Sequence, residues 1–524
     1  MDSVSATKNR SIVPLLLALC SFVALFVITY PYYKYYIDSD SVAYFTIARR
    51  YVAGDMRAIN GLWSPFSPWL VALCIKNGMD ELLAAHLVNA GACISIITAT
   101  FFLFRRFAVD TFITIVLLLS LSVFLAYCQY EQLFDDLWQN AFLLFYLLLI
   151  TSKSFFTKAW KWILCGVIAA VAYFAKTYSF YFIILHLAVT LVILCSKEQK
   201  PYKAVIKPFI TVIVVMLLTM SPWLYLLHGK YGKWTISNAG AMNASWSLVG
   251  HKTFRPDIKY LIPPPYDNSP ANIEDPSFSQ GHLYSMFESP RLFALRIVRC
   301  GLAVVQGGHF INDISGLLLA VLLASMSLMF FRKQQLIFNT NHLILLWGSL
   351  IMPAGYVLQH FEARYIWLLT YTGMILGATW IMYLKGYFDN KIAYYFATAC
   401  FGLSFMIFPF FQMKTLFRKG EDIYLNAQKI KAMGLHGTFT SNDNPNWAPA
   451  TALLTHMPYY TIEHFEIAPS DMLAEMRRYR INYYFFYCNP VDQAAIQLKD
   501  EQGNPFTDVT NNTIKGLKIY RITP

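Results

Sequence analysis

The chain has 524 residues, of which 56% are hydrophobic and only 14% are charged, and its mean hydropathy is +0.43. Soluble domains carry about a quarter charged residues, so this composition excludes an ordinary soluble globular protein. The net charge of +12 does not indicate a nucleic-acid partner, because the basic residues lie mostly between apolar runs, as they do in membrane proteins.

The apolar residues gather in runs of about twenty, the length that crosses a bilayer as a helix. We therefore predict a mainly α, polytopic membrane protein with about eleven transmembrane helices. In chain order, the predicted spans are 12–31, 82–104, 109–127, 137–152, 162–175, 178–196, 207–227, 311–331, 341–358, 364–384 and 392–411.

Lysines and arginines cluster in alternate connections between these spans, which marks one side of the membrane as cytoplasmic. The clusters include Arg105 with Arg106 and Arg332 with Lys333. The N-terminus then lies in the cytoplasm, and the outer side receives 32–81, 128–136, 228–310, 359–363 and 412–524. We expect two parts: a transmembrane domain over 1–411 and a small outer α/β domain over 412–524.

The outer tail alternates strand and helix patterns. Residues 437–441 (GTFTS) and 482–488 (NYYFFYC) are rich in aromatic and β-branched residues, which is typical of strands. Residues 469–480 have helical spacing, and Ser470 is the predicted N-cap. A further helix at 290–305 is expected to lie at the membrane interface.

The first outer loop begins with YIDSDSVAYFTIARRYVAGD, residues 36–55. Val42, Phe45 and Ala48 fall on one face of a helix, so we predict a short helix lying on the membrane. Asp38 and Asp40 stand at its start. Either carboxylate suits the positive end of the helix dipole as a cap, and either suits a general base or an ion ligand. One can cap while the other performs chemistry.

A second group of acids, Glu131, Asp135 and Asp136, lies in a short outer loop before a span. These residues form either a solvated turn or one wall of the same cavity as Asp40. Asp136 is nearest to the span, and carboxylates near membrane depth usually have a partner or a function. A divalent metal ion bridging acids from the two loops is a further possibility, because hard cations prefer carboxylate oxygens.

The candidate cations lie in two other outer connections. Lys176 stands alone between two apolar runs, where it either extends to the lipid headgroups or contacts a lipid phosphate. His360, Glu362 and Arg364 share a loop of a few residues. The planar fork of an arginine binds two phosphate oxygens, although an interfacial ion pair between Arg364 and Glu362 is an equal alternative.

The order of these features resembles GT-C-type membrane glycosyltransferases, and within them the bacterial aminoarabinose transferases of lipid A and the protein O-mannosyltransferases. The resemblance covers 10–411. Its motifs are Asp40-x3-Tyr44, SPFSPWL at 64–70, the acid at 136, AAVAYFAKTY at 169–178, PWLYLLHGKYGKW at 222–234 and HFEARYIWLL at 360–369. The chain departs from the aminoarabinose branch at 63–68, where WSPFSP replaces an acidic-lysine-proline motif.

The resemblance implies inverting transfer of a sugar from a polyprenyl-phosphate donor to a lipid, glycan or protein acceptor. It implies that Asp40, whose spacing to Tyr44 fits the motif better than that of Asp38, is the catalytic base. Arg364, Lys176 and His360 would hold the donor phosphate. Asp136, with Asp135 and Glu362, would line the cavity or bind a metal. The branch resembled also implies a bacterial inner membrane and a periplasmic C-terminal domain.

Three alternatives remain from the residues alone. A lipid-linked-glycan transporter or flippase would also be polytopic, although its charges would be expected near the bilayer midplane rather than on one outer face. A glycan polymerase or ligase, or a nonenzymatic assembly subunit, would have the same composition. No GxxxxGK[ST] or GxGxxG motif is present, so the sequence does not indicate a nucleotide site.

Overall fold

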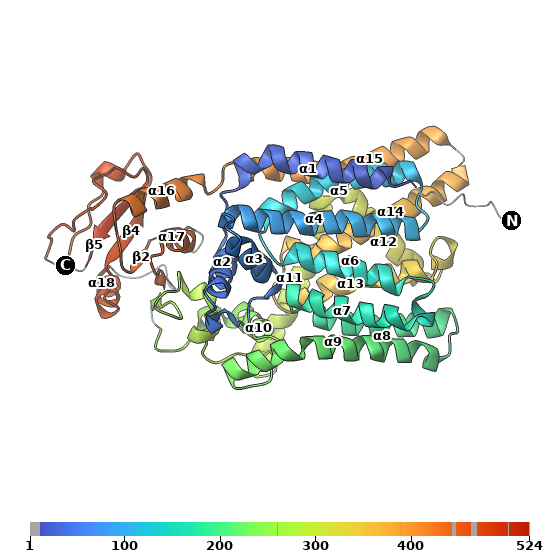
Figure 1. Cartoon of the computed structure of the whole chain (residues 1–524), viewed down its shortest axis with the longest axis horizontal. Coiled ribbons are helices and arrows are strands. Elements are labelled where there is room, and N and C mark those ends of the chain that lie inside the picture. Colours follow the sequence, from blue (N-terminus) through green and yellow to red (C-terminus); the bar gives the residue numbers. More distant parts are fainter. Residues whose placement is uncertain are drawn as a thin grey trace.

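The computed structural model describes residues 11–258, 260–388, 390–442, 447–462, 469–500 and 502–522. The molecule is elongated: a bundle of long helices forms one end and the C-terminal module forms the other (Figure 1). Between them lie shorter helices that run across the bundle axis, including α2 (Ser39–Val52), α3 (Phe66–Lys76) and α10 (Ala239–Val249).

The bundle contains a helix at each predicted span. These helices are α1 (Val13–Tyr33), α4 (Glu81–Arg106), α5 (Thr111–Glu131), α6 (Asp136–Ile150), α7 (Ala159–Ala175), α8 (Ser179–Lys197), α9 (Tyr202–Tyr231), α12 (Gly316–Phe330), α13 (Thr340–Val357), α14 (Trp367–Phe388) and α15 (Lys391–Leu416). The predicted separation of 162–175 from 178–196 is correct. Within the described residues, seven helical stretches are long and apolar enough to cross a membrane, and the count of eleven stays a prediction.

The predicted span at 311–331 has the wrong start. Residues 311–314 end a longer helix, α11 (Pro290–Ile314), which also extends the predicted interfacial helix at 290–305. The helix is interrupted at Ser315, which has extended dihedrals (φ −167°, ψ 112°). Its hydroxyl accepts a hydrogen bond from Leu318 N at 3.1 Å and so caps α12. A hydrophobicity pattern alone does not register this change of direction.

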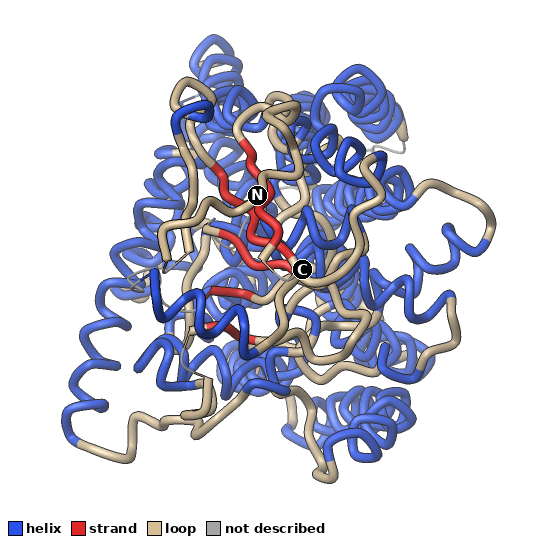
Figure 2. The backbone as a smooth tube through the Cα atoms, turned by 90° about the vertical axis from the view of Figure 1, so that its left-hand side faces the viewer, coloured by secondary structure: helices blue, strands red, loops and turns tan. Residues whose placement is uncertain are grey.

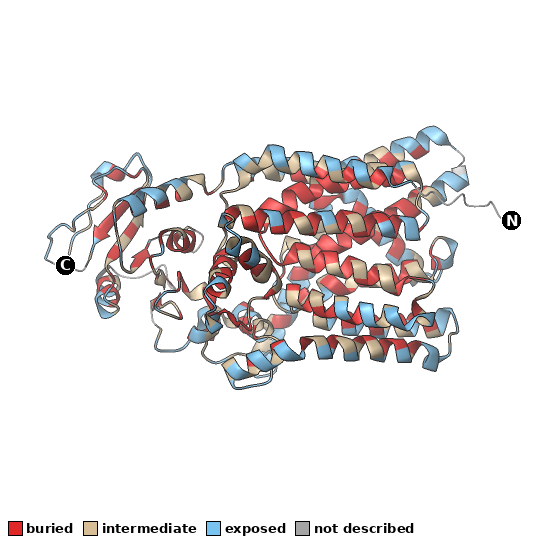
Figure 3. Ribbon diagram, in the orientation of Figure 1, coloured by how far each residue is buried: buried red, intermediate tan, exposed pale blue. Residues whose placement is uncertain are grey.

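Helix α2 exists as predicted, but most of it is buried within the protein. All residues from Ser41 to Ala48 are buried. The helix is covered by α3, by the short outer helix at Asn272–Glu274 and by α17 (Ala448–Thr455), and much of its visible ribbon is red in Figure 3. The outer loops and the C-terminal module therefore enclose the segment that carries Asp38 and Asp40.

Small residues allow the bundle helices to approach closely. A Cβ on Gly166 of α7 would lie 2.6 Å from Cβ of Val215 on α9, and one on Gly402 of α15 would lie 2.5 Å from Cγ1 of Val116 on α5. Such contacts are typical of helices packed in a membrane, where close van der Waals packing replaces the hydrophobic effect. They give the bundle a continuous buried interior (Figure 3).

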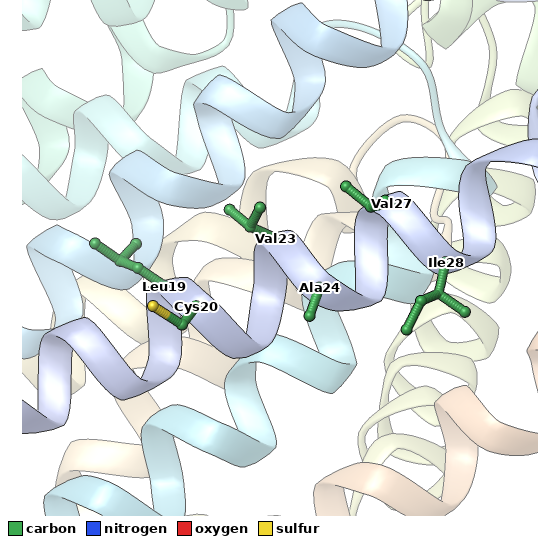
Figure 4. Close-up of a pocket in the computed structure, with 6 residues that line it drawn as sticks. All are labelled: Leu19, Cys20, Val23, Ala24, Val27 and Ile28. Atoms are coloured by element: carbon green, nitrogen blue, oxygen red, sulfur yellow. The ribbon is translucent and has the colours of Figure 1, made fainter.

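The outer surface of α1 carries a shallow apolar groove. It is lined by Leu19, Cys20, Val23, Ala24, Val27 and Ile28 (Figure 4). Most of these side chains are exposed, as expected where a spanning helix faces lipid. The groove contains none of the predicted site residues, so it belongs to the lipid-facing surface of the bundle.

The C-terminal module has a three-stranded sheet in the order β2-β4-β5. Strand β2 (Phe439–Ser441) pairs in parallel with β4 (Tyr483–Tyr487), and β4 pairs antiparallel with β5 (Leu517–Arg521). In the end view of Figure 2 these strands lie over the centre of the helical bundle. The two predicted strands are correct.

Helices α16 (Glu421–Ala432), α17 and α18 (Pro469–Arg478) complete the module. The predicted N-cap is wrong, because α18 begins at Pro469 and Ser470 lies in its first turn. A second, two-residue pairing ties the module to the outer loop 228–310: β1 (Leu261–Ile262) lies antiparallel to β3 (Thr461–Ile462).

A buried ion pair fastens that outer loop to α2. Arg50 is 5% exposed and pairs with Glu274, which is 1% exposed; one of the two hydrogen bonds measures 2.9 Å from Nη2 to Oε2. Arg50 also pairs with Asp55 at 2.7 Å and lies over the ring of Tyr266 at 5.0 Å. Removing Glu274 leaves Arg50 with only Asp55, which is shared with Arg57, and an incompletely compensated buried charge costs more than the pair itself contributes.

We predict that Glu274→Gln destabilises the protein by about 3 kcal/mol, near the lower end of the range for breaking a buried pair. It should lower the midpoint of thermal unfolding in detergent and make residues 260–280 sensitive to protease. Glu288→Gln is the matched control, because Glu288 pairs with His282 at an exposed position. Equal stability of the two variants would contradict this account.

Candidate active site

The cluster is organised by Arg364, which lies in the short helix Ala363–Ile366 before α14. Its Nη2 donates to Oδ2 of Asp40, in the first turn of α2, at 3.0 Å. Its Nη1 lies 3.6 Å from Oδ2 of Asp136, the first residue of α6, and its Nε lies 2.7 Å from Oε2 of Glu362. The guanidinium of Arg364 therefore brings together three predicted carboxylates, and these four residues come from three outer connections.

Lys176 completes the cluster from a fourth connection. It follows α7, and its ammonium pairs with Oδ1 of Asp136, which is nearly fully buried. The ammonium also lies 4.9 Å from the ring centre of Tyr365. The predicted alternative in which Lys176 extends to the headgroups is wrong, because the side chain turns into the protein. The solvated-turn alternative for Asp136 is wrong for the same reason.

His360 and Glu362 form the outer rim of the cluster. His360 Nε2 lies 3.1 Å from Oε1 of Glu362. The side chain of His360 is 49% exposed and that of Glu362 is 35% exposed. Burial acts to raise the pKa of Glu362, but the hydrogen bond from His360 and the charge of Arg364 outweigh it and hold this pKa at about 2. Glu362 is therefore ionised at neutral pH and shares Arg364 with Asp40.

The two acids of the first outer loop have different environments. Asp38 is the N-cap of α2, and its Oδ1 accepts a hydrogen bond from Ser41 N at 2.6 Å. Burial, together with the charge of nearby Asp40, raises the pKa of Asp38 to about 7. Asp38 therefore has the capping contact, whereas Asp40, two residues further on, faces Arg364.

Asp135 lies in a strained loop between α5 and α6. Phe134 and Asp135 both have positive φ, at 78° and 30°, which is unfavourable for residues with a Cβ. Asn89 holds the loop, since its Oδ1 accepts from Phe134 N at 3.1 Å and its Nδ2 donates to Gln132 O at 2.9 Å. Such strain is typical of positions that the surrounding structure must fix for function.

The hydroxyl of Tyr44 donates a hydrogen bond to Oδ2 of Asp135. Asp40 and Tyr44 are four residues apart on α2, so the same helical face contacts Asp135 and Arg364. Burial raises the pKa of Asp135 well above its usual range. Asp135 is therefore a contact that fixes α2 against α6 rather than a second exposed carboxylate.

Sequence reasoning missed the aromatic floor beneath Lys176. Tyr356 and Tyr365 are buried and stacked, with their ring centres 3.6 Å apart. Tyr365 directly follows Arg364, and that adjacency was the available signal. Tyr356 comes from the end of α13, and no motif links it to the cluster. Asn89 was missed for the same reason, because it lies inside an apolar run.

The carboxylates of the cluster are engaged in ion pairs rather than grouped as metal ligands. Within the residues that the structure describes, no group of three or more His, Cys, Asp or Glu side chains is arranged to hold a metal ion. Asp40, Asp136 and Glu362 instead form ion pairs with Arg364 and Lys176. A divalent metal ion at this cluster stays a prediction, and no chemical step below depends on one.

Chemically, the cluster combines cations with a partly exposed carboxylate. The Asp40 side chain is 27% exposed, whereas Arg364 is 14% exposed. Two cations near an accessible carboxylate suit a reaction in which an anionic group leaves and a hydroxyl loses its proton.

Comparison with solved structures identifies the fold. ArnT from Cupriavidus metallidurans, crystallised with undecaprenyl phosphate, matches over 99% of both chains with a TM-score of 0.53 and 12% identity. The oligosaccharyltransferase of Archaeoglobus fulgidus, in a complex with Zn and sulfate, matches over 90% of this chain and 68% of its own, with a TM-score of 0.54 and 11% identity.

The chain therefore has the fold of these two GT-C glycosyltransferases, as the resemblance implied. No protein-family model matches the sequence, and no curated protein matches it by sequence. At identities of 11% and 12%, the comparison concerns the fold, and the roles of individual residues have to be argued from the contacts above.

The environment of Asp38 gives a prediction for stability. Because its pKa in the folded protein is raised above the ordinary value of 3.8, the unfolded chain ionises first as the pH rises. The wild type should lose stability between about pH 4 and pH 7. Asp38→Asn removes this titration, so its unfolding midpoint should improve relative to wild type by several degrees from pH 5 to pH 8.

Asp80→Asn is the matched control, because Asp80 caps α4 at an exposed position. The two variants should be compared by thermal unfolding at several pH values. If the difference between Asp38→Asn and wild type were the same at pH 5 and pH 8, the shifted pKa of Asp38 would be disproved.

Proposed function

We propose that the protein is a membrane glycosyltransferase that moves a hexose or pentose from a polyprenyl-phosphate donor to a lipid, glycan or protein hydroxyl on the outer side of the membrane. One observation carries the proposal: Asp40 is held by Arg364, which also contacts Asp136, the partner of Lys176. The shared fold supports it, because ArnT was crystallised with undecaprenyl phosphate.

The cations would serve the leaving group. A sugar linked to a lipid phosphate leaves that phosphate with added negative charge as the glycosidic bond breaks. Arg364 is suited to bind two phosphate oxygens through its planar fork, and Lys176 to add a point charge. His360, at the exposed rim, would approach the phosphate from the outer side. Fixed cations that face developing charge lower the barrier because they need no reorganisation.

Asp40 would be the general base. It accepts the proton of the acceptor hydroxyl while that oxygen forms a bond to the anomeric carbon. The bond from the anomeric carbon to the phosphate oxygen breaks, and its electron pair stays on the phosphate. Attack from the face opposite the phosphate inverts the anomeric centre. When the donor phosphate competes for Arg364, Asp40 loses its ion-pair partner and becomes available to accept a proton.

The topology supports the same assignment. The cluster lies at the end of the bundle that bears the C-terminal module, opposite the end at which α1 begins (Figure 1). The positive-inside pattern puts the N-terminus in the cytoplasm. We propose an integral protein of a bacterial inner membrane, with a catalytic transmembrane domain over about 1–411 and a periplasmic domain over the remainder.

We predict that Asp40→Asn lowers sugar transfer by about 10²- to 10⁴-fold, the usual contribution of a general base. The assay uses purified protein in nanodiscs with a panel of polyprenyl-phosphate sugars and separates kcat from KM. Because the amide cannot accept the proton, the loss should fall on kcat. Binding of the lipid donor should persist, since Arg364 remains.

Asp110→Asn is the matched control. Asp110 caps α5 at the other end of the bundle and pairs with Lys385, so its replacement should leave transfer unchanged. Full activity of Asp40→Asn would remove Asp40 as the base. Movement of the lipid-linked sugar across the bilayer without transfer would favour a flippase instead.

A further inference from the structure

The cations of the cluster already form ion pairs with carboxylates. Arg364 and Lys176 carry two positive charges, whereas Asp40, Asp136 and Glu362 carry three negative charges. A lipid phosphate would bring at least one more negative charge into this cluster. Binding it tightly therefore requires another cation within reach, because an uncompensated charge in a partly buried site is costly.

Such a cation lies on the linker between α15 and α16. Lys419 follows the end of α15, and its Nζ lies 3.8 Å from the ring centre of Tyr36. Tyr36 is two residues before Asp38 and four before Asp40. Among the described residues, no carboxylate forms an ion pair with Lys419, while its neighbour Arg418 pairs with Glu421 at 3.0 Å.

The linker is fixed in this place by several contacts. Arg418 N donates to Tyr32 O at 2.9 Å, and Phe417 stacks on the Tyr32 ring with the centres 5.6 Å apart. Gly420 has a φ of +82°, and a Cβ there would lie 2.6 Å from Tyr35 O, so only glycine fits. The backbone that carries Lys419 is therefore held against the segment that leads into α2.

The charges of Lys419 and Arg364 act on a shared neighbour. Glu131, at the end of α5, is within electrostatic range of both cations. Tyr36, beneath Lys419, is likewise within range of Arg364, Asp38 and Asp40. A lysine held over an aromatic ring keeps its ammonium hydrogens available, so it can donate to an incoming anion while the ring supports its position.

We propose that Lys419 is a third phosphate-binding cation, which binds the phosphate of the lipid donor together with Arg364 and Lys176. This inference rests on the proposed function. It gives the linker to the C-terminal module a direct part in substrate binding. A lysine suits this position because its ammonium is a compact point charge on a flexible stem, able to leave the ring of Tyr36 for a phosphate oxygen.

The test compares binding of undecaprenyl phosphate with binding of the uncharged alcohol undecaprenol, using the full-length protein in nanodiscs. Lys419→Met should weaken binding of undecaprenyl phosphate by about tenfold, as expected for the loss of one charge-assisted hydrogen bond, and leave binding of undecaprenol unchanged. Lys419→Arg should retain phosphate-dependent binding, and in transfer assays Lys419→Met should raise KM for the donor with little change in kcat.

Lys414→Met is the matched control. Lys414 also lies over aromatic rings, 5.1 Å from that of Phe410 and 5.3 Å from that of Phe411, but on the exposed surface of α15. It should behave as wild type. If Lys419→Met bound undecaprenyl phosphate as tightly as wild type, this inference would be overturned and the proposed function would stand. If wild type bound the alcohol and the phosphate equally, both would be overturned.

Discussion

A single guanidinium, that of Arg364, connects the parts of the molecule that matter for chemistry. It reaches Asp40 from the first outer loop and Asp136 from the second, and it is paired with Glu362 from its own loop. These carboxylates would repel each other if they were brought together without it. This charge therefore helps to hold α2 against the bundle, together with the hydrogen bond from Tyr44 to Asp135.

The enclosure of α2 follows from the same need. An ion cluster exposed to water contributes little, because solvent and salt screen it. Here α3, the outer loop and α17 cover α2, and the ion pair between Arg50 and Glu274 joins the outer loop to α2. The outer segments thereby lower the local dielectric around Asp40 and leave part of its side chain accessible. That combination is what a base facing a lipid-bound substrate requires.

The sequence predicted the bundle well, because runs of about twenty apolar residues report directly on membrane spans. It also indicated a set of charged candidates, because charged side chains close to a bilayer are costly and usually have a partner or a function. These are Asp40, Asp136, Lys176 and Arg364. It failed where tertiary contacts decide: the burial of α2 by the outer segments and the break at Ser315 were missed. In the sequence, Tyr356 and Asn89 cannot be distinguished from other residues of apolar helices. Their proximity to the site results from tertiary packing, which the sequence pattern does not report.

The three aspartates near α2 show how environment separates chemically identical groups. Asp38 accepts from a backbone N–H and has a pKa of about 7, so it is partly protonated at neutral pH. Asp135 is buried, hydrogen-bonded to Tyr44 and shifted further toward its neutral form. Asp40 alone combines a cationic partner with an accessible side chain. Acids whose environments differ in this way usually have different roles, and the proposed base is the one of the three that is both accessible and paired with a cation.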